Sequence, residues 1–389
     1  MLGGARVIVG LDVADGAVTV AVRELDGRQT IHDGRGALDE LAAGGRVRAV
    51  AAAVADHWLD GARDGARHLE QLHHDVVERL RLPLRSVVRR SQATAARYAD
   101  GGADLILVLE PTPELATAAL YQVESAQVRP LGAAGRRVAD DTGPVRQALG
   151  EAVAQADAAA HARAASVLPR CRHSRYRGTP LYSRSGTGRY TAGEVLEWYA
   201  GIEAALTDSV ARALPATAPT GTVQVVTTGP LRDFPPLAHP AQVGGRPLPA
   251  ALAAAPRDCA AGALLLAEES VRAVEQPARF AVRLPTSRVW AGRLRSESVP
   301  LHTPTGQPNL AVGWDGHELA VDVDATRQLT VDVHDTDPAA VTSAWTVTLQ
   351  PRPAPGRYRL GLWAGRFGPG VLVLRPADGA EPQLFPLSQ

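Results

Sequence analysis

The order of predicted strands and helices occurs twice along the chain, and this repeat restricts the possible folds more than any other feature. Three strands are predicted in succession at residues 7–13, 18–24 and 28–32, and three more at residues 104–110, 115–124 and 127–131. Apolar runs of this length, separated by turn residues, are typical of strands joined as hairpins. Helical and strand patterns follow each set, so the sequence predicts two similar α/β halves.

Each half continues with segments of helical periodicity. In the first half, a short helical stretch is predicted at residues 36–43, and strands are predicted at residues 47–54 and 84–88. A second helix is predicted between these two strands, with apolar residues at Leu69, Leu72, Val76, Val77 and Leu80. In the second half, helices are predicted at residues 145–167, 191–214 and 259–274, with a strand at residues 222–228. Strands that alternate with helices favour sheets with parallel neighbours. We therefore predict a two-lobed α/β module over residues 1–275, with lobes of about residues 1–100 and 101–275.

The pattern changes beyond residue 277. Short alternating runs are predicted as strands at residues 278–284, 288–294, 318–323, 329–333, 343–349, 358–363 and 371–374. Clusters of Gly, Pro and Asp separate them at a spacing typical of all-β domains. The sequence predicts a β-sandwich or barrel over residues 278–389.

The composition argues against several classes of function. The 41 basic residues, all Arg, balance 41 acidic residues, so no overall field favours nucleic acid or an anionic membrane as a partner. No run reaches the roughly 18 apolar residues of a membrane span. Cys171 and Cys259 have no nearby partner cysteine, which argues against zinc and disulfides. Because residues 1–13 lack the pattern of a signal peptide, we expect a cytoplasmic protein.

The loop between the first two strands of the second half has an unusual composition. Residues 105–120 read LILVLEPTPELATAAL, with Pro-Thr-Pro where the chain turns. A tight hairpin favours Gly, Asn or Asp, which adopt positive φ, whereas proline fixes φ near −65° and has no N–H. This turn therefore cannot have the flexible, donor-rich backbone of a glycine loop.

Five motifs in this order resemble the actin/Hsp70 superfamily of ATPases, whose core is a duplicated ribonuclease-H-like fold. They span about 270 residues: VGLDVADGAVTVAV at 9–22, SQATAARYADGG at 91–102, LILVLEPTPELATAAL at 105–120, TVQVVTTGPLRDFPPL at 222–237 and DCAAGALLLAEE at 258–269. They are similar to the first phosphate loop, the first connecting helix, the second phosphate loop, the adenosine motif and the second connecting helix. The resemblance implies ATP or ADP with Mg²⁺ as ligands.

The resemblance also implies roles for individual residues. It places Asp12 near a metal, Asp15 and Gly16 at the first phosphate loop, Gln92 at the position that orients the attacking water, and Thr228 and Gly229 at the adenosine motif. Gly262 would allow close helix packing. All seven are thus candidate nucleotide-binding residues by resemblance.

The departures from the family are concentrated in the second phosphate loop. The family's magnesium-linked aspartate falls on Leu109, and its glycines fall on Pro111, Thr112 and Pro113. Leucine cannot coordinate a metal, and proline offers no N–H to a phosphate. The chain also has no lysine for the γ-phosphate, and the planar guanidinium of Arg does not replace an ammonium geometrically. Since phosphoryl transfer depends on metal bridging and positioned donors, the sequence indicates a degenerate ATPase.

Three functions follow as hypotheses. The first is a non-catalytic Hsp70-like scaffold, adaptor or chaperone-like protein with weak or no nucleotide binding, which meets a protein partner through residues 278–389. The second is an active Mg-ATP-dependent ATPase, chaperone or phosphotransferase that uses Asp12 and Gln92 with an unusual second loop. The third is a structural or secretion-associated assembly protein.

Two further features have mainly structural interpretations. The segment 170–190 is rich in Arg and Tyr and could grip phosphates or an acidic partner, but a solvated loop is the simpler interpretation. The spacing of His68, His73 and His74 does not place two ligands on one helix face, which argues against a metal site.

Overall fold

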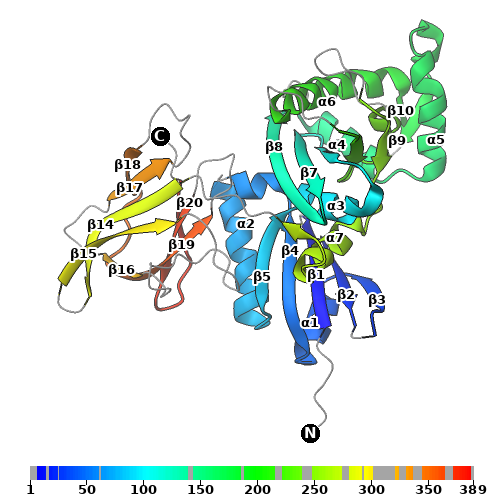
Figure 1. Cartoon of the computed structure of the whole chain (residues 1–389). Coiled ribbons are helices and arrows are strands. Elements are labelled where there is room, and N and C mark those ends of the chain that lie inside the picture. Colours follow the sequence, from blue (N-terminus) through cyan, green and yellow to red (C-terminus); the bar gives the residue numbers. More distant parts are fainter. Residues whose placement is uncertain are drawn as a thin grey trace. The chain divides into compact units, whose positions relative to one another are not determined.

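The structure is a computed structural model, and Figure 1 shows its elements in chain order. It describes residues 7–14, 17–24, 26–60, 63–138, 143–184, 188–214, 221–238, 248–273, 280–290, 293–300, 320–323, 330–335, 344–363 and 371–386. The chain divides into two compact units: Met1–Arg89 with Glu275–Gln389, and Arg90–Val274.

The first unit contains a five-stranded mixed sheet. Its elements are β1 (Val7–Ala14), β2 (Ala17–Arg23), β3 (Gln29–Asp33), α1 (Gly36–Ala43), β4 (Val47–Val54), α2 (Arg63–His73, continued as a π-helix over His74–Arg79) and β5 (Leu84–Arg89). The strand order is β3-β2-β1-β4-β5. β1, β2 and β3 pair antiparallel, whereas β4 pairs parallel with both β1 and β5.

The second unit contains a six-stranded mixed sheet. Its elements are α3 (Arg90–Arg97), β6 (Leu105–Pro111), β7 (Leu115–Glu124), β8 (Gln127–Arg137), α4 (Gly143–Ala154), α5 (Ala158–Val167), β9 (Pro180–Ser183), β10 (Arg189–Thr191), α6 (Ala192–Ala213), β11 (Val223–Thr227), β12 (Ala251–Ala253), α7 (Asp258–Ala267) and β13 (Arg272–Ala273). The strand order is β12-β11-β6-β7-β8-β13. β6, β7 and β8 form an antiparallel meander, and β11 pairs parallel with β6 and β12.

The two sheets share one topology. In each, the first strand of a meander lies beside a parallel strand reached through helices, so both have the order third, second, first, fourth, fifth. This confirms the predicted duplicated α/β arrangement with mixed sheets. The second sheet has one extra strand, β13, which pairs parallel with β8.

Both faces of the second sheet are buried, as the alternation along β6 shows. Leu105, Leu107 and Leu109 belong to one core cluster with residues of α4, α5 and α6, whereas Ile106 and Val108 belong to another with residues of α3. Figure 1 shows α6 beside β7 and β8. A strand buried on both faces is expected to be continuously apolar, which explains the sequence of β6.

The two connecting helices of this unit pack at very short range. A Cβ atom at Gly262 of α7 would overlap the carbonyl group of Ala93 in α3, so only glycine fits there. The hydroxyl of Tyr98 donates a 2.6 Å hydrogen bond to Asp258 at the start of α7. Burial raises the pKa of Tyr98, and the bond to Asp258 acts in the same direction. The backbone contact and the hydrogen bond together fix α7 against α3.

The C-terminal part of the first unit forms two four-stranded antiparallel sheets. The strands are β14 (Phe280–Trp290), β15 (Arg293–Pro300), β16 (Ala320–Val323), β17 (Thr330–Asp335), β18 (Ala344–Thr348), β19 (Gly356–Trp363), β20 (Val371–Pro376) and β21 (Gln383–Pro386). The sheet orders are β15-β14-β17-β18 and β16-β19-β20-β21. The all-β prediction for this region holds at the level of these antiparallel sheets, and their arrangement as a sandwich or barrel stays a prediction.

Two predicted element limits were wrong, and one strand was not predicted. The predicted strand 288–294 covers parts of two antiparallel strands, because Trp290 at the end of β14 pairs with Arg293 at the start of β15. The predicted helix 259–274 ends at Ala267, because Glu269 adopts a φ of 60° and Arg272 and Ala273 pair with β8. The strand β21 was not predicted, since its four residues include Pro386 and follow Pro382.

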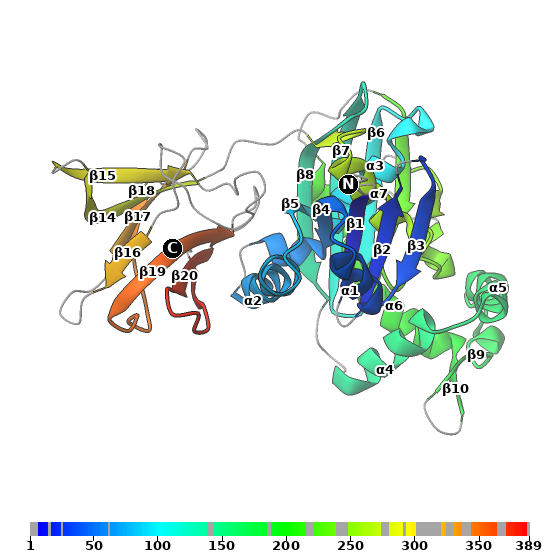
Figure 2. The same cartoon turned by 90° about the horizontal axis from the view of Figure 1, so that it is seen from below.

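The core of the first unit joins elements distant in sequence. Leu38 of α1 and Leu69 of α2 belong to one cluster with Val9 and Leu11 of β1, so both helices cover the same face of the sheet (Figure 2). The cluster also contains Val371 and Val373 of β20. α2 is therefore packed against both the N-terminal sheet and the C-terminal strands. None of the helices in the described ranges is long and apolar enough to cross a membrane.

Candidate functional site

The residues predicted for the nucleotide are divided between the two units. Asp12 lies in β1, where its Cα neighbours across the sheet are Thr19 of β2 and Ala53 of β4. Asp15 and Gly16 lie outside the described residues. The other predicted residues belong to the second unit.

In the second unit, the ends of the neighbouring strands β6 and β11 bring several predicted residues together. The backbone N–H of Thr228 donates to the carbonyl of Leu109 at 2.8 Å. Gly229 adopts a φ of +81°, and a Cβ atom there would lie 3.0 Å from Cγ of Glu110. Leu109 itself is fully buried in the core. The acidic side chain at this strand end is therefore Glu110, a residue that the motif comparison missed by one position.

Glu110 forms a buried ion pair with Arg90 at the start of α3. Nη1 of Arg90 lies 2.6 Å from Oε1 of Glu110, and both side chains are buried. A buried charge is stable only when a partner and further hydrogen bonds replace its hydration. The carboxylate at the end of β6 is thus already paired with a guanidinium of the same unit.

The turn after β6 uses its own backbone donors. The N–H of Thr112 donates to the carbonyl of Leu115 at 2.8 Å, and the N–H groups of Glu114 and Leu115 both point to Oγ1 of Thr112, at 3.4 and 2.9 Å. Pro111 and Pro113 have no N–H. Every backbone N–H of residues 111–115 is therefore used in a hydrogen bond within the turn. The hydroxyl of Thr112 closes this hairpin in place of a glycine.

The tip of this turn is also covered by protein. A Cβ atom at Gly150 of α4 would overlap the ring of Pro113, so the helix and the proline ring touch. A phosphate loop needs free backbone N–H groups directed at the anion. The described residues of this turn do not fit a nucleotide phosphate, and the carboxylate at its base does not fit a metal while Arg90 is bonded to it.

Gln92 is half-buried in the first turn of α3. Its neighbour Ser91 is buried and bonds to the hydroxyl of Tyr121 in β7 at 2.7 Å. The adjacent Arg90 and Ser91 thus fix the start of the helix to β6 and β7. Gln92 remains a candidate by resemblance alone.

The Arg/Tyr-rich segment 170–190 includes the β9–β10 hairpin and turns before it. The guanidinium of Arg175 lies 4.8 Å from the ring centre of Tyr176, and that of Arg184 lies 4.4 Å from the ring centre of Tyr190. Arg184 also pairs with Glu194 at 2.7 Å. The arginines of this segment that the structure describes are exposed, which agrees with the solvated-loop interpretation.

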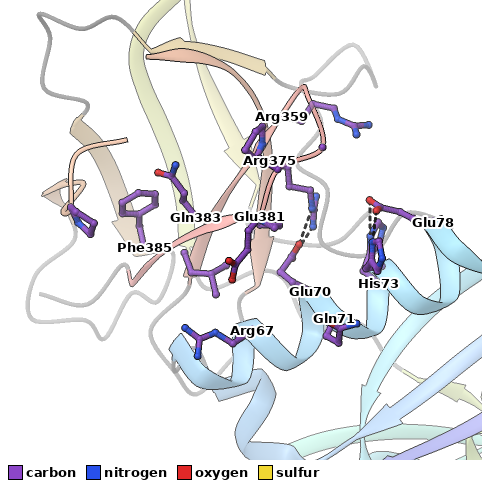
Figure 3. A pocket seen from close by; sticks show the side chains of 17 residues that line it. Arg67, Glu70, Gln71, His73, Glu78, Arg359, Arg375, Glu381, Gln383 and Phe385 are labelled. Carbon is purple, nitrogen blue, oxygen red and sulfur yellow. Dashed lines mark hydrogen bonds and ion pairs between the residues drawn. The ribbon is translucent and has the colours of Figure 1, made fainter. Parts of the chain in front are cut away.

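A separate cavity of about 570 Å³ lies within the first unit, between α2 and the sheet β16-β19-β20-β21 (Figure 3). Its wall from α2 is a polar stripe that includes Arg67, Glu70, His73, His74 and Glu78. These residues recur about every three or four positions, so they share one helix face. The opposite wall comes from β19, β20, β21 and the connection between the last two.

At the centre of this cavity, Glu70 and Arg375 form a bidentate ion pair. Nε and Nη2 of Arg375 donate to the two carboxylate oxygens of Glu70, each at 2.8 Å (Figure 3). The exposed fractions of the two side chains are 9% for Glu70 and 7% for Arg375. Two parallel charge-assisted bonds give this pair a fixed geometry.

His73 lies beside this pair and stays neutral near pH 7. Burial lowers the pKa of His73 to about 4, and the charge of Arg375 is the next largest cause. Its neighbour His74 is exposed, and Nδ1 of His74 lies 2.8 Å from Oε2 of Glu78. That hydrogen bond is the main cause that lowers the pKa of Glu78.

Sequence reasoning missed this cavity. The polar face of an amphipathic helix is normally exposed to water, so the positions of Glu70 and His73 in the sequence do not indicate a cavity. Arg375 follows Val371 and Val373 at a period of two, so it extends the face of β20 that joins the apolar core. The one sequence feature that could have indicated the cavity is the charge of Arg375 at the end of this apolar face.

Comparisons with known proteins give only a partial structural similarity. No family model and no curated protein matches the chain. The chain is similar to a solved structure of an uncharacterized protein with similarity to peptidase YeaZ from Pseudomonas aeruginosa, with 22% identity, a TM-score of 0.26, and coverage of 36% of this chain and 70% of that chain. A structure of YeaZ from Pseudomonas aeruginosa gives 22% identity, a TM-score of 0.25 and the same coverage, 36% and 70%. TM-scores of this size carry no functional argument.

Proposed function

We propose that this chain is a non-catalytic scaffold, built on a degenerate actin/Hsp70-like α/β module, that binds nucleotide weakly or not at all. The observation that carries the proposal is the hydrogen bonding of residues 111–115. Two of these residues are prolines, and the other three donate their N–H groups within the turn. A backbone without free N–H groups cannot donate hydrogen bonds to the oxygens of a phosphate.

The buried pair of Arg90 and Glu110 supports the same conclusion. A carboxylate that held a hydrated Mg²⁺ would have to leave this guanidinium, and breaking a buried ion pair costs about 3–5 kcal/mol. The proposal assigns the pair a structural role at the ends of β6 and α3.

Titration calorimetry of the full chain with Mg-ATP and Mg-ADP tests the proposal. We expect a dissociation constant weaker than about 100 µM for both nucleotides. Tighter binding that is lost in Asp12→Ala, and kept in the exposed control Asp100→Ala, would contradict the scaffold and favour the active ATPase or phosphotransferase.

The second half of the proposal is a protein partner for residues 278–389. The strands β16 and β21 are the edges of their sheet, and edge strands carry backbone groups that can pair with another chain. The full chain should capture a partner that is lost when the exposed Asp322 of β16 is changed to Arg. Capture that is unaffected by this substitution would place the partner elsewhere.

A further inference from the structure

The segment from α5 to the start of α6 carries a strong positive charge. Residues 158–193 contain seven Arg and neither Asp nor Glu, whereas the rest of the chain contains the other 34 Arg and all 41 acidic residues. The formal charge of this segment is therefore +7 in a chain of zero net charge. All seven arginines are exposed. A local field of this size attracts anions although the whole chain is neutral.

Six of these seven residues make up what we call the arginine cluster: Arg163, Arg170, Arg172, Arg175, Arg177 and Arg189. None of the six has an ion pair with an acidic residue in the described part of the chain, whereas Arg184, the seventh, pairs with Glu194. Other arginines of this unit do have carboxylate partners, as at Arg90, Arg97 and Arg136. The cluster therefore presents exposed guanidinium groups whose charge is not neutralised by the described residues.

The backbone that carries the centre of the cluster is held in fixed turns. Leu168–Arg170 and Ser174–Tyr176 are single turns of 3-10 helix. Cys171 between them is buried in the core of the unit, and the N–H of Gly193 in α6 donates to the carbonyl of Arg177 at 2.8 Å. A backbone that is ordered before binding loses less conformational entropy when a partner docks.

The cluster extends from these turns onto α5 and β10. Arg163 lies in α5 and Arg189 lies in β10. Figures 1 and 2 both show α5 beside the β9–β10 hairpin. The hydroxyl of Tyr182 in β9 lies 3.3 Å from Nδ1 of His161 in α5, which joins the helix to the hairpin. The exposed arginines thus come from neighbouring elements of one unit.

The surroundings of the cluster favour a short protein segment over nucleic acid. Proteins that bind single strands stack the bases on exposed aromatic rings. Both tyrosines of the β9–β10 hairpin are buried, and the guanidinium of Arg175 lies 4.8 Å from the ring centre of Tyr176. Glu194 and Glu197 are exposed at the start of α6 and would repel a long polyanion.

The chemistry of the cluster also argues for carboxylates and against a membrane surface. Every Leu, Val and Tyr in the described part of residues 158–193 is buried or half-buried, so no bulky apolar side chain is available to enter a bilayer. A guanidinium can donate two parallel hydrogen bonds to one carboxylate. Four arginines within residues 170–177 could therefore engage several carboxylates of one acidic run.

We propose that the arginine cluster docks a short acidic segment of a partner protein, whose Asp and Glu carboxylates pair with the four arginines at residues 170–177. This surface belongs to the second unit and shares no residue with the partner region 278–389. It adds a second docking region to the proposed scaffold, and it does not depend on whether nucleotide binds.

Fluorescence anisotropy with the full chain tests this docking. The probe is a labelled octapeptide of alternating Glu and Asp, compared with an octapeptide of alternating Gln and Asn and with an octanucleotide of uridylate. In about 50 mM salt we expect the acidic octapeptide to bind with a dissociation constant tighter than about 500 µM. A weaker constant, equal binding of the amide octapeptide, or tighter binding of the octanucleotide would overturn the proposal.

Substitutions locate the binding on the cluster. Arg172→Gln combined with Arg175→Gln should weaken binding of the acidic octapeptide at least about tenfold. Arg46→Gln combined with Arg48→Gln removes the same charge from exposed positions in the first unit and is the matched control, which should change binding less than about twofold. Equal weakening in the two double variants would show that the peptide responds to net charge alone and would overturn the assignment.

The salt dependence is a second measurement, which requires no variant. The screening length falls from about 10 Å at 0.1 M salt to about 3 Å at 1 M, so pairs between exposed charges weaken as salt is added. Raising the salt from about 50 mM to about 500 mM should abolish binding of the acidic octapeptide. Binding that persists unchanged would contradict docking on exposed arginines. Circular dichroism of each variant checks the fold.

Discussion

At the scale of single residues, the end of β6 and the turn after it bond to groups of their own unit. Thr112 supplies a hydroxyl that closes a hairpin without glycine, and Arg90 supplies a guanidinium that neutralises Glu110. Both groups are positioned to satisfy their own unit. The lack of backbone donors at Pro111 and Pro113 follows from the sequence. The ion pair was not predictable, because its partners are 20 residues apart and belong to different elements.

Removing one partner of the ion pair should reduce stability much more than replacing both partners with apolar residues. Arg90→Ala leaves Glu110 buried and unpaired, so we expect a loss of about 3–5 kcal/mol in the stability of β6. The double variant Arg90→Met with Glu110→Leu should recover most of this loss. Hydrogen exchange of the β6 amides measures both.

Arg212 of α6 provides the matched control for this prediction. Its ion pair with Asp208 lies at the surface, with side chains 52% and 35% exposed, so Arg212→Ala should cost at most about 1 kcal/mol. An Arg90→Ala protein as stable as Arg212→Ala would contradict a buried, structurally required pair.

At the scale of elements, the fold depends on one helix contact that tolerates no side chain. Gly262→Ala improves helix propensity by about 1 kcal/mol, but its methyl group would overlap the carbonyl of Ala93. We therefore expect a net loss of about 1–3 kcal/mol from overpacking. Thermal unfolding, compared with Gly36→Ala in α1, where a Cβ meets open space, measures the difference.

The control separates crowding from propensity. Gly36→Ala should be neutral or stabilising, because only the propensity changes there. If Gly262→Ala were equally well tolerated, α3 and α7 would have to be further apart than the structure shows.

At the scale of the whole molecule, the sequence pattern predicted the order of the elements but not the contacts between residues far apart in the chain. The repeated strand order was predictable because each meander is local, with apolar runs of strand length separated by turn residues. Element ends were less predictable, as in α7, where pairing of Arg272 with β8 ends the helical segment. The cavity was not predictable, because Glu70 and Arg375 are separated by 305 residues and neither lies in a recognisable motif.

The first unit should lose stability in mild acid. His73 has a pKa of about 4 in the folded chain against 6.5 for an unperturbed histidine. Between these values the unfolded state binds more protons, so stability falls as the pH drops from about 6.5 to about 4. The full shift corresponds to about 3 kcal/mol. Hydrogen exchange of the α2 amides at pH 7 and pH 4.5 measures this loss.

His73→Gln should remove most of this pH dependence, because glutamine does not titrate. His74→Gln changes the exposed neighbour and serves as the control. If the two variants lost the same stability between pH 7 and pH 4.5, the buried histidine would not be the cause.

The contact of α2 with β20 also has a consequence for the order of folding. The second unit, Arg90–Val274, is continuous in sequence and can complete its core as soon as its last residue is synthesised. The N-terminal strands and α2 are made first, but Glu70 has no Arg375 to bond until another 305 residues have left the ribosome. The part of the chain that is synthesised first is therefore the part that finishes folding last, and its polar helix face stays exposed to other binding proteins throughout that interval.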